Sequence, residues 1–552
     1  MAEIPDKPAL EGLEDKWDVA WNAAGTYRFD RARAAAAGRG GVYSIDTPPP
    51  TASGSLHIGH VFSFTHTDIT ARYERMRGKA VFYPMGWDDN GLPTERRVQN
   101  YYGVRCDPSL PYDASFTPPF EGTTKTIKPA DQVPVSRRNF IELCERLTVE
   151  DEKQFEAVFR QLGLSVDWDQ TYRTISDDTI RTSQLAFLRN IERGEAYQAL
   201  APTLWDVDFR SAIAQAELED RDQQASYHRI AFHKSDGSGD VHIETTRPEL
   251  LPACVALVAH PDDERYRPLF GSTVRTPLFD VEVPVLPHPL AQPDKGSGIA
   301  MICTFGDVTD IIWWRELDLP NRTILGKDGR LVAEAPDVIV SDRGTAAYAE
   351  LAGKTVFSAK KAVVEQLEAS GELMSVSAPF THPVKFFEKG DRPLEIVSTR
   401  QWYIRNGARD ESLRERLIAF GREMSWHPDF MRVRYENWTG GLTGDWLVSR
   451  QRFFGVPIPV WYGLDAEGER DYSRVLTPDP QSLPVDPTID VPTGFTEDQR
   501  GMPGGFDAER DIFDTWATSS LTPQLVGGWE RDPELWDLVS PFDLRPQGQD
   551  II

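Results

Sequence analysis

The chain has 552 residues, more than one hydrophobic core accommodates, so we expect about two to four domains. Hydrophobic residues make up 40% and charged residues 26%, as in an ordinary globular protein, and no apolar run approaches the roughly 18 residues of a membrane-spanning helix. The formal net charge of −26 argues against non-specific coating of nucleic acid through a broadly positive surface, but it allows a structured RNA on a local basic patch.

Neither a targeting signal nor a cross-linking pattern is visible. The first ten residues, MAEIPDKPAL, are acidic and contain no apolar run, so we expect no signal peptide, no membrane partner and a cytoplasmic location. The four cysteines lie far apart and form no CxxC pair, which argues against a disulfide framework and against a zinc site.

The first hundred residues predict a nucleotide-binding sheet. GVYSIDTPPP (41–50) has the β-branched and aromatic character of a strand that enters a proline-stiffened turn. A helical pattern follows from Leu56 to about Met76, and KAVFYPMGWDDNGLPTE (79–95) indicates a second strand with a polar loop at its carboxyl end. A strand, a glycine-containing turn, a helix and a strand form a βαβ unit, so we expect an α/β fold with a Rossmann-type parallel sheet.

The middle of the chain predicts a different structure. Short apolar strands separated by proline and glycine recur between residues 222 and 345, namely DVHIETT, CVALVAH, VEVPVLPH and IAMICTF. This pattern is typical of a compact β-rich insert. We therefore expect an N-terminal helix with the first half of the sheet domain (1–200), linker strands (201–221), the insert (222–345), and a return linker with the second half of the sheet domain (346–552).

The string PPPTASGSLHIGH (48–60) marks the start of the first predicted helix of the sheet. His57 and His60 are three residues apart and share one helical face, while Gly54 and Gly59 leave room for a ligand beside the backbone. A helix N-terminus attracts phosphate, and an imidazole pair there can stabilise charge that develops on it. The alternative is a proline turn followed by two solvent-exposed histidines, and HxxH alone would favour that alternative.

These motifs resemble those of a known enzyme family. HIGH (57–60) is similar to the first signature of class I aminoacyl-tRNA synthetases, and the wider string around it (46–95) resembles the valine-specific members of the archaeal-like subgroup. Isoleucine-specific members usually have Tyr-Ala-Asn after the paired prolines and Cys-His after Trp-Asp. Here Thr51 follows Pro49 and Pro50, and Asp-Asn follows Trp-Asp (87–90), so valine is favoured and isoleucine is the alternative.

The resemblance implies that valine is activated with ATP and Mg²⁺ and transferred to tRNA(Val). The implied ATP-binding residues are Gly54, His57, Gly59, His60, Gly548 and Asp550, with both histidines on the phosphates. The implied amino-acid site consists of Pro49, Pro50, Thr51, Asp88, Trp446, Ile512 and Trp516. Asp88 stands where the family binds the ammonium group of the amino acid. Without the resemblance, we would interpret Asp88 as a cap for the next helix, and each tryptophan as ordinary core.

The insert resembles an editing domain. Valine-specific synthetases reject threonine only about a hundredfold during activation, so a second, hydrolytic site is needed. HIETTRPELL (242–251) and GSGIAMICTFGDVTD (296–310) are similar to two editing motifs, which implies the residues Thr245, Thr246, Arg247, Asp307 and Asp310. In this pattern Arg247 meets the terminal phosphate or ribose of the tRNA and Asp310 binds the amino group of the mischarged residue. We expect a positioned water as the nucleophile.

Two departures from the family pattern matter. Asp206 and Phe209 occupy the places of cysteines in a zinc knuckle, so we predict no structural zinc. No KMSKS-like string occurs, so we expect an amino-terminal fragment with severely impaired adenylation that ends before the anticodon-binding domain. We expect a monomer. The rival interpretation is a non-ligating paralogue that binds or deacylates tRNA.

Overall fold

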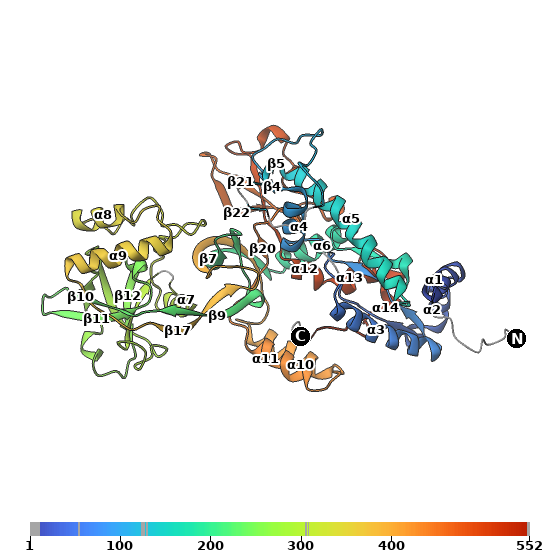
Figure 1. The fold of residues 1–552 in the computed structure, drawn as a ribbon, viewed down its shortest axis with the longest axis horizontal. Helices are drawn as coiled ribbons and strands as arrows, with labels where there is room; N and C mark the ends of the chain where they lie inside the picture. Colours follow the sequence, from blue (N-terminus) through green and yellow to red (C-terminus); the bar gives the residue numbers. More distant parts are fainter. Residues whose placement is uncertain are drawn as a thin grey trace. The chain divides into compact units, whose positions relative to one another are not determined.

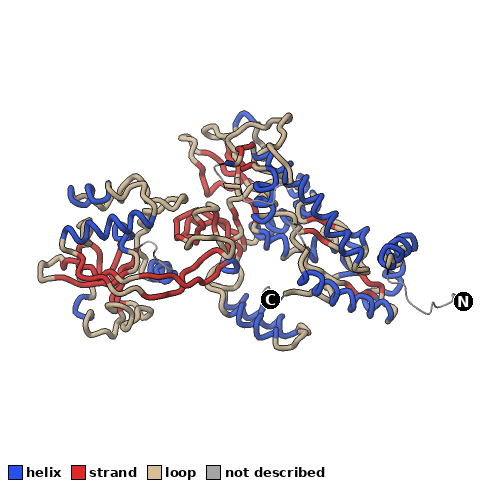
Figure 2. The backbone as a smooth tube through the Cα atoms, viewed as in Figure 1, coloured by secondary structure: helices blue, strands red, loops and turns tan. Residues whose placement is uncertain are grey.

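The computed structural model describes residues 11–52, 56–122, 127–128, 131–303, 306 and 308–548. The chain divides into two compact units (Figure 1). Unit 1 consists of Met1–Tyr197 and Trp402–Ile552, and unit 2 consists of Gln198–Gln401. Helices predominate in unit 1 and strands in unit 2 (Figure 2). Unit 2 contains the predicted insert (222–345) together with the segments on either side of it.

Unit 1 opens with the predicted βαβ arrangement, and this prediction is confirmed. Strand β1 (Val42–Ser44) pairs in parallel with β2 (Ala80–Phe82), and α3 (Ile58–Met76) connects them. The helix begins two residues after the predicted start and ends at the predicted residue. Its buried residues Phe64 and Ala71 belong to the same hydrophobic cluster as Val81 of β2. The apolar face of α3 therefore covers the sheet, which gives unit 1 its Rossmann-type character.

The free edge of β1 is occupied by the last described segment of the chain. Ile45 forms a parallel bridge with Leu544, and the Asp46 N–H donates a hydrogen bond to the Leu544 carbonyl oxygen at 2.9 Å. The next parallel pair is formed by β3 (Gly86–Trp87) and β6 (Tyr172–Arg173). The segments that follow these strands therefore leave the sheet at its carboxyl edge, where α/β proteins bind their ligands.

The other elements of unit 1 are further helices and short strands, some of which form separate small sheets. Its further helices are α1 (Leu13–Ala24), α2 (Arg31–Ala37), α4 (Leu92–Tyr102), α5 (Arg137–Gln161), α6 (Asp177–Glu192), α10 (Glu411–Glu423), α11 (Met431–Gly440), α12 (Thr515–Ser519), α13 (Thr522–Gly527) and α14 (Pro533–Val539). Its further strands are β4 (Val104–Cys106), β5 (Val133–Val135), β19 (Trp446–Leu447), β20 (Ser449–Arg450), β21 (Trp461–Leu464), β22 (Arg470–Leu476), β23 (Phe506–Ala508) and β24 (Ile512–Phe513). Strands β7 (Ala196–Asp206) and β18 (Glu395–Ile404) carry the chain from one unit to the other.

Unit 2 is built on a seven-stranded sheet, with the order β11-β10-β13-β14-β12-β15 and β16 paired with β10. The strands are β10 (His228–Lys234), β11 (Asp240–Thr245), β12 (Cys254–Ala259), β13 (Thr273–Arg275), β14 (Glu282–Pro287), β15 (Ile299–Cys303) and β16 (Leu373–Val376). The four strands predicted in the insert are confirmed as β11, β12, β14 and β15. The sheet also includes β16, which lies beyond residue 345, because β16 pairs antiparallel with β10.

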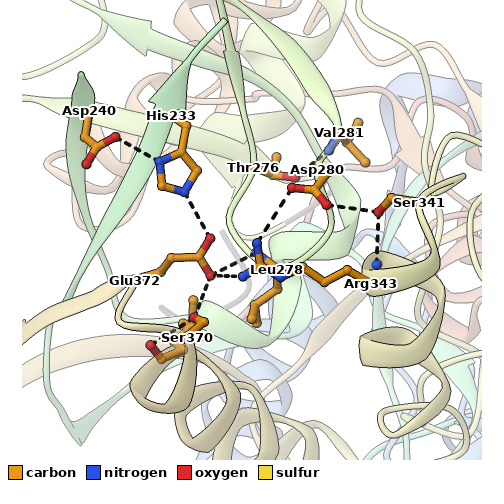
Figure 3. A network of polar contacts seen from close by, with 12 residues as sticks. His233, Asp240, Thr276, Leu278, Asp280, Val281, Ser341, Arg343, Ser370 and Glu372 are labelled. Atoms are coloured by element: carbon orange, nitrogen blue, oxygen red, sulfur yellow. Dashed lines mark hydrogen bonds and ion pairs between the residues drawn. The ribbon is translucent and has the colours of Figure 1, made fainter. Parts of the chain in front are cut away.

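Helices and a two-stranded ribbon complete unit 2. The helices are α7 (Val308–Glu316), α8 (Asp342–Ala349) and α9 (Val356–Ser370), and the ribbon is formed by β9 (Leu218–Ala225) and β17 (Phe380–Phe387). A network of polar contacts centred on Glu372 joins the end of α9 to β10, α8 and the turn before β14 (Figure 3). Among the described residues, no helix is both long and apolar enough to cross a membrane.

Candidate active site

The two histidines of the HIGH motif lie together at the start of α3. His57 is the N-cap residue, and its backbone N–H donates a hydrogen bond to Nδ1 of His60 at 3.2 Å. The rings stack with their centroids 3.8 Å apart. Burial, followed by repulsion from His57, lowers the pKa of His60. His60 is therefore neutral at pH 7, and because its Nδ1 accepts a hydrogen bond, Nε2 carries the proton that can be donated to a ligand.

The ring of Phe155 lies near both His60 and β3, the strand that precedes Asp88. The ring centroids of His60 and Phe155 are 6.3 Å apart, and those of Phe155 and Trp87 are also 6.3 Å apart. Phe155 therefore lies between the first turn of α3 and β3.

Asp88 lies between segments from distant parts of the chain. Its N–H donates to the Pro50 carbonyl oxygen at 3.0 Å, and the Ala52 N–H donates to the Asp88 carbonyl oxygen at 2.8 Å, which forms a parallel bridge between Thr51 and Asp88. Asp88 is 7% exposed, and its Oδ1 accepts a hydrogen bond from the Thr174 hydroxyl at 3.3 Å. The structure therefore brings together the proline segment and the predicted ammonium-binding carboxylate.

The alternative for Asp88, a cap on the following helix, is wrong. Helix α4 has Gly91 as its N-cap residue, with no side-chain hydrogen bond at that end. The neighbouring Asp89 pairs instead with Arg173 at 3.2 Å, and Arg173 also pairs with Glu152 at 2.7 Å. Burial, followed by repulsion from Glu152, raises the pKa of Asp89, against the opposing charge of Arg173.

The carboxylate of Asp514 forms contacts that hold together the residues predicted to form the apolar wall of the amino-acid site. Asp514 accepts a hydrogen bond from Nε1 of Trp446 at 3.2 Å and caps α12 by accepting the Trp516 N–H at 3.1 Å. It also forms an ion pair with Arg450 at 2.8 Å, and Arg450 pairs with Ile512 across β20 and β24. Ile512 is 2% exposed whereas Trp516 is 43% exposed. The structure thus places these three predicted wall residues in one local arrangement.

Contacts at Gly91 connect this wall with the Asp88 loop. The Gly91 N–H donates to the Phe454 carbonyl oxygen at 3.0 Å. A Cβ on Gly91 would come within 2.4 Å of Oγ1 of Thr515, the first residue of α12, and its φ of +86° also favours glycine. Glu95, in the first turn of α4, accepts hydrogen bonds from the backbone N–H groups of Phe453 and Phe454 at 2.8 and 3.0 Å. The sequence carries no local signal for this role of Glu95.

Asp46, at the carboxyl end of β1, is a second residue that sequence reasoning missed. It is 1% exposed, forms an ion pair with Arg545 and accepts a hydrogen bond from the Thr522 hydroxyl at 3.1 Å. Burial raises the pKa of Asp46, against the opposing effect of Arg545. In the described structure, Oδ1 of Asp46 and Oγ1 of Thr47 are buried without a hydrogen-bond partner. Buried polar atoms are normally hydrogen-bonded, so both oxygens are suited to a polar ligand at this end of the sheet.

The predicted nucleotide contacts are partly described. Gly59 lies beside His57, and a Cβ there would come within 3.0 Å of the His57 ring, which would have to shift slightly to make room. Gly548 is exposed near the end of the described chain. Gly54 and Asp550 lie outside the described residues. The role of all four in binding ATP stays a prediction.

The two predicted editing motifs meet at Gly306 in unit 2. Nη1 of Arg247 donates to the Gly306 carbonyl oxygen at 3.3 Å, and the Gly306 N–H donates to Oδ2 of Asp310 at 2.6 Å. Asp310 is 6% exposed and lies in the first turn of α7. Thr245, at the end of β11, accepts the Arg247 N–H through its hydroxyl at 3.0 Å. Asp307 lies outside the described residues.

Arg247 is held by carboxylates within unit 2. It pairs with Glu249 at 3.0 Å and with Glu395 at 2.6 Å. Burial lowers the pKa of Arg247, but the two carboxylates outweigh it and raise that pKa. The guanidinium group therefore stabilises the turn after β11, and its contact with tRNA stays a prediction. Lys360 of α9, which the sequence did not single out, brings a second cation to this turn by donating to the Thr246 carbonyl oxygen at 2.7 Å.

The segment after Asp206, where the family pattern has a zinc knuckle, forms a tight turn that a carboxylate closes. Asp206 ends β7, and its Oδ1 accepts the N–H groups of Asp208 and Phe209 at 2.9 and 2.8 Å. The chain then enters β8 (Ser211–Ala212). In the part of the chain that the structure describes, no three His, Cys, Asp or Glu side chains are grouped as a metal site requires. The absence of structural zinc stays a prediction.

Comparison with known proteins shows several long alignments. The chain is 73% identical over 550 residues to the valine–tRNA ligase of Leifsonia xyli subsp. xyli and 65% identical over 549 residues to that of Thermobifida fusca. These alignments cover 100% of this chain but 64% and 61% of the relatives, so the chain spans less than two thirds of their length. A crystal structure described as the ternary complex of Agrobacterium radiobacter K84 agnB2 LeuRS, tRNA and LeuAMS is 15% identical, with 97% of this chain and 62% of that chain covered and a TM-score of 0.44.

A family model covers almost the whole chain. The model described as tRNA synthetases class I (I, L, M and V) matches residues 16–110 and 122–552. The matched residues include the βαβ unit of unit 1, the Asp88 loop and the whole of unit 2. The chain therefore belongs to the class I tRNA synthetases of the I, L, M and V group.

Proposed function

We propose that the chain contains the amino-acid-activating core and the editing unit of a valine–tRNA ligase. One observation carries the proposal: the carboxyl edge of the sheet in unit 1 combines an imidazole pair at a helix N-terminus, the carboxylate of Asp88 and the apolar wall held by Asp514. These features suit a phosphate, an ammonium group and an aliphatic side chain, which are the parts of an aminoacyl-adenylate. The aligned curated relatives, which are valine–tRNA ligases, support the choice of valine.

The proposed reaction has two steps. An oxygen of the valine carboxylate attacks the α-phosphorus of ATP, which enters as its Mg²⁺ complex; valyl-adenylate forms and pyrophosphate leaves. A hydroxyl of the terminal ribose of tRNA(Val) then attacks the valyl carbonyl carbon, and AMP leaves. No side chain forms a covalent bond, so the protein acts by positioning the reactants and stabilising charge. His57 and His60 would contact the phosphates, and Asp88 would bind the ammonium group through a charge-assisted hydrogen bond.

The test is ATP–pyrophosphate exchange with the protein extended to the length of its relatives, which we expect to act as a monomer in the cytoplasm. Exchange with valine should exceed exchange with isoleucine by about a hundredfold or more, because an additional methylene does not fit a rigid pocket. Faster exchange with isoleucine would identify an isoleucine–tRNA ligase. Lack of exchange with any amino acid would favour the non-ligating paralogue.

We also propose that unit 2 hydrolyses threonyl-tRNA(Val). The hydrogen bonds that connect Arg247, Gly306 and Asp310 support this, because they bring the two motifs into contact. The test follows the release of threonine from pre-charged tRNA by the parent chain, the Asp310→Ala variant and an Asp262→Ala control, whose side chain is 82% exposed. Release that only Asp310→Ala abolishes would support editing by unit 2. Equal rates in all three would contradict the role of Asp310.

A further inference from the structure

Thr174 connects the two adjacent acidic residues of the candidate amino-acid site. It follows β6, is 0% exposed, and its backbone N–H donates to the Trp87 carbonyl oxygen at 3.0 Å. Its hydroxyl donates to Oδ1 of Asp88 at 3.3 Å and accepts the Asp89 N–H at 3.1 Å. One buried hydroxyl thus contacts both the carboxylate of Asp88 and the backbone immediately after it.

The chemistry of a threonine hydroxyl determines which group donates in the hydrogen bond between Thr174 and Asp88. The group has a single hydrogen to donate, and the N–H of Asp89 already occupies one of its lone pairs, so the hydrogen is directed to Asp88. The β-branched side chain of Thr174 has few rotamers, and burial restricts it further. The hydroxyl is therefore a fixed donor, and a fixed donor limits the rotation of the carboxylate that accepts from it.

The strand that precedes Thr174 is itself held in place. The preceding Arg173 pairs with Asp89 at 3.2 Å and with Glu152 at 2.7 Å, and it donates to the hydroxyl of Thr148 at 3.2 Å. Helix α5 supplies both Glu152 and Thr148. On the other side, the backbone of Asp88 is bound to the Pro50–Ala52 segment. Thr174 therefore acts between two anchored segments, which is what pre-organisation of a binding group requires.

We propose that Thr174 is a positioning residue that holds the Asp88 carboxylate in the orientation that receives the ammonium group of the amino acid. The inference rests on the proposed function, since it deepens the role of Asp88. It implies that Thr174 strengthens the binding of ligands with an ammonium group and contributes nothing to ligands that lack one. A purely structural threonine would affect both kinds of ligand equally.

The test compares two stable ligands by isothermal titration calorimetry on the 552-residue chain. One is valyl-sulfamoyl-adenosine, an analogue of valyl-adenylate; the other is its desamino analogue, in which an isovaleryl group replaces valyl. Thr174→Val, which keeps the shape of the side chain but removes its hydroxyl, should raise the Kd of the valyl compound about tenfold, as expected for one hydrogen bond to a charged group. The Kd of the desamino compound should stay within about twofold, given that this ligand offers no ammonium group to Asp88.

Two further variants test whether the hydroxyl of Thr174 itself causes the change in affinity. Thr174→Ser restores the hydroxyl and should recover most of the affinity for the valyl compound. Thr182→Val is the matched control, because Thr182 is 5% exposed and its hydroxyl donates only within its own helix, to the Asp178 carbonyl oxygen at 2.9 Å. This control should bind both compounds as the parent does.

The outcomes separate this inference from the proposed function. If the parent binds both compounds equally, the role of Asp88 fails and the inference fails with it. If the parent prefers the valyl compound and Thr174→Val keeps that preference, the inference alone is overturned. Equal weakening of both compounds by Thr174→Val, or by Thr174→Ala if the valine variant does not fold, would assign Thr174 a structural role and also overturn the inference.

Discussion

Glu372 holds together a polar network in unit 2 whose loss should be measurable as local unfolding (Figure 3). The residue lies between α9 and β16 and is 5% exposed. Its carboxylate accepts hydrogen bonds from His233 at 3.0 Å, the Leu278 N–H at 3.2 Å, Arg343 at 2.5 Å and Ser370 at 2.6 Å. We expect Glu372→Gln to weaken the packing of α8, β10 and β16 on one another.

The magnitude follows from the four contacts. His233 and Arg343 have side chains that are 41% and 45% exposed, so solvent screening reduces each ionic contact to about 0.5–1 kcal/mol. The hydrogen bonds from the Leu278 N–H and Ser370 contribute about 0.5–1.5 kcal/mol each. Glutamine keeps one acceptor oxygen and places an amide donor opposite these donors, so the total loss is about 2–4 kcal/mol. For a unit of about 200 residues, the melting temperature would fall by about 4–16 °C.

Hydrogen–deuterium exchange with mass spectrometry measures this effect locally. Peptides from β10, the turn at 276–281, α8 and β16 should exchange faster in Glu372→Gln, while peptides from β1 and β2 of unit 1 serve as an internal reference. Glu368→Gln is the matched control, because Glu368 is exposed on the same helix, α9. Unchanged exchange in the four segments, or an equal increase in unit 1, would refute the reasoning.

The same network predicts a dependence on pH. The hydrogen bond to Glu372 raises the pKa of His233, which also pairs with Asp240 at 2.8 Å. The contribution of His233 is therefore fully present below its unfolded pKa of about 6.5 and is lost as the pH rises through the higher folded value. Burial raises the pKa of Glu372, but its hydrogen bonds outweigh this effect and lower that pKa, so its contribution is present above about pH 4.3 and is lost on further acidification. Protection of β10 should be greatest between about pH 4.3 and 6.5, and His233→Gln should remove the decline at higher pH.

Further predictions concern the candidate active site. His60→Ala should slow ATP–pyrophosphate exchange about a hundredfold without changing valine affinity measured in the absence of ATP, because it removes a donor to the developing phosphate charge; an equal loss of valine affinity would contradict that role. Asp514→Ala should destabilise unit 1 by about 3–5 kcal/mol in urea unfolding followed by tryptophan fluorescence, because the guanidinium group of Arg450, with a side chain 7% exposed, loses its ion pair with Asp514. Asp514→Asn should cost less, because it keeps an acceptor for Trp446; equal costs would exclude the ion pair as the cause.

Elements that depend on local periodicity could be predicted from the sequence. The pattern from Leu56 to Met76 predicted α3, which spans Ile58–Met76, and short apolar runs separated by proline and glycine predicted four strands of unit 2. Long-range partners could not be predicted in this way. The hydroxyl of Thr174 reaches Asp88 across 86 residues of sequence, and Glu95 binds the Phe454 N–H across 359. These contacts depend on which strands and loops become neighbours, and no local pattern of residues encodes that choice.

By itself, the sequence determined the opening βαβ unit and the family of the chain, because hydrophobic period and the HIGH string are properties of contiguous residues. Only the tertiary structure decided which groups surround the candidate site. It placed Leu544 beside Ile45, paired Asp46 with Arg545, and showed that Asp88 binds the proline segment and Thr174 instead of capping α4. The physical reason is that many segments of a long chain could supply the hydrogen-bond partners that a strand edge or a buried carboxylate needs. The packing of the whole core selects the segment that arrives there.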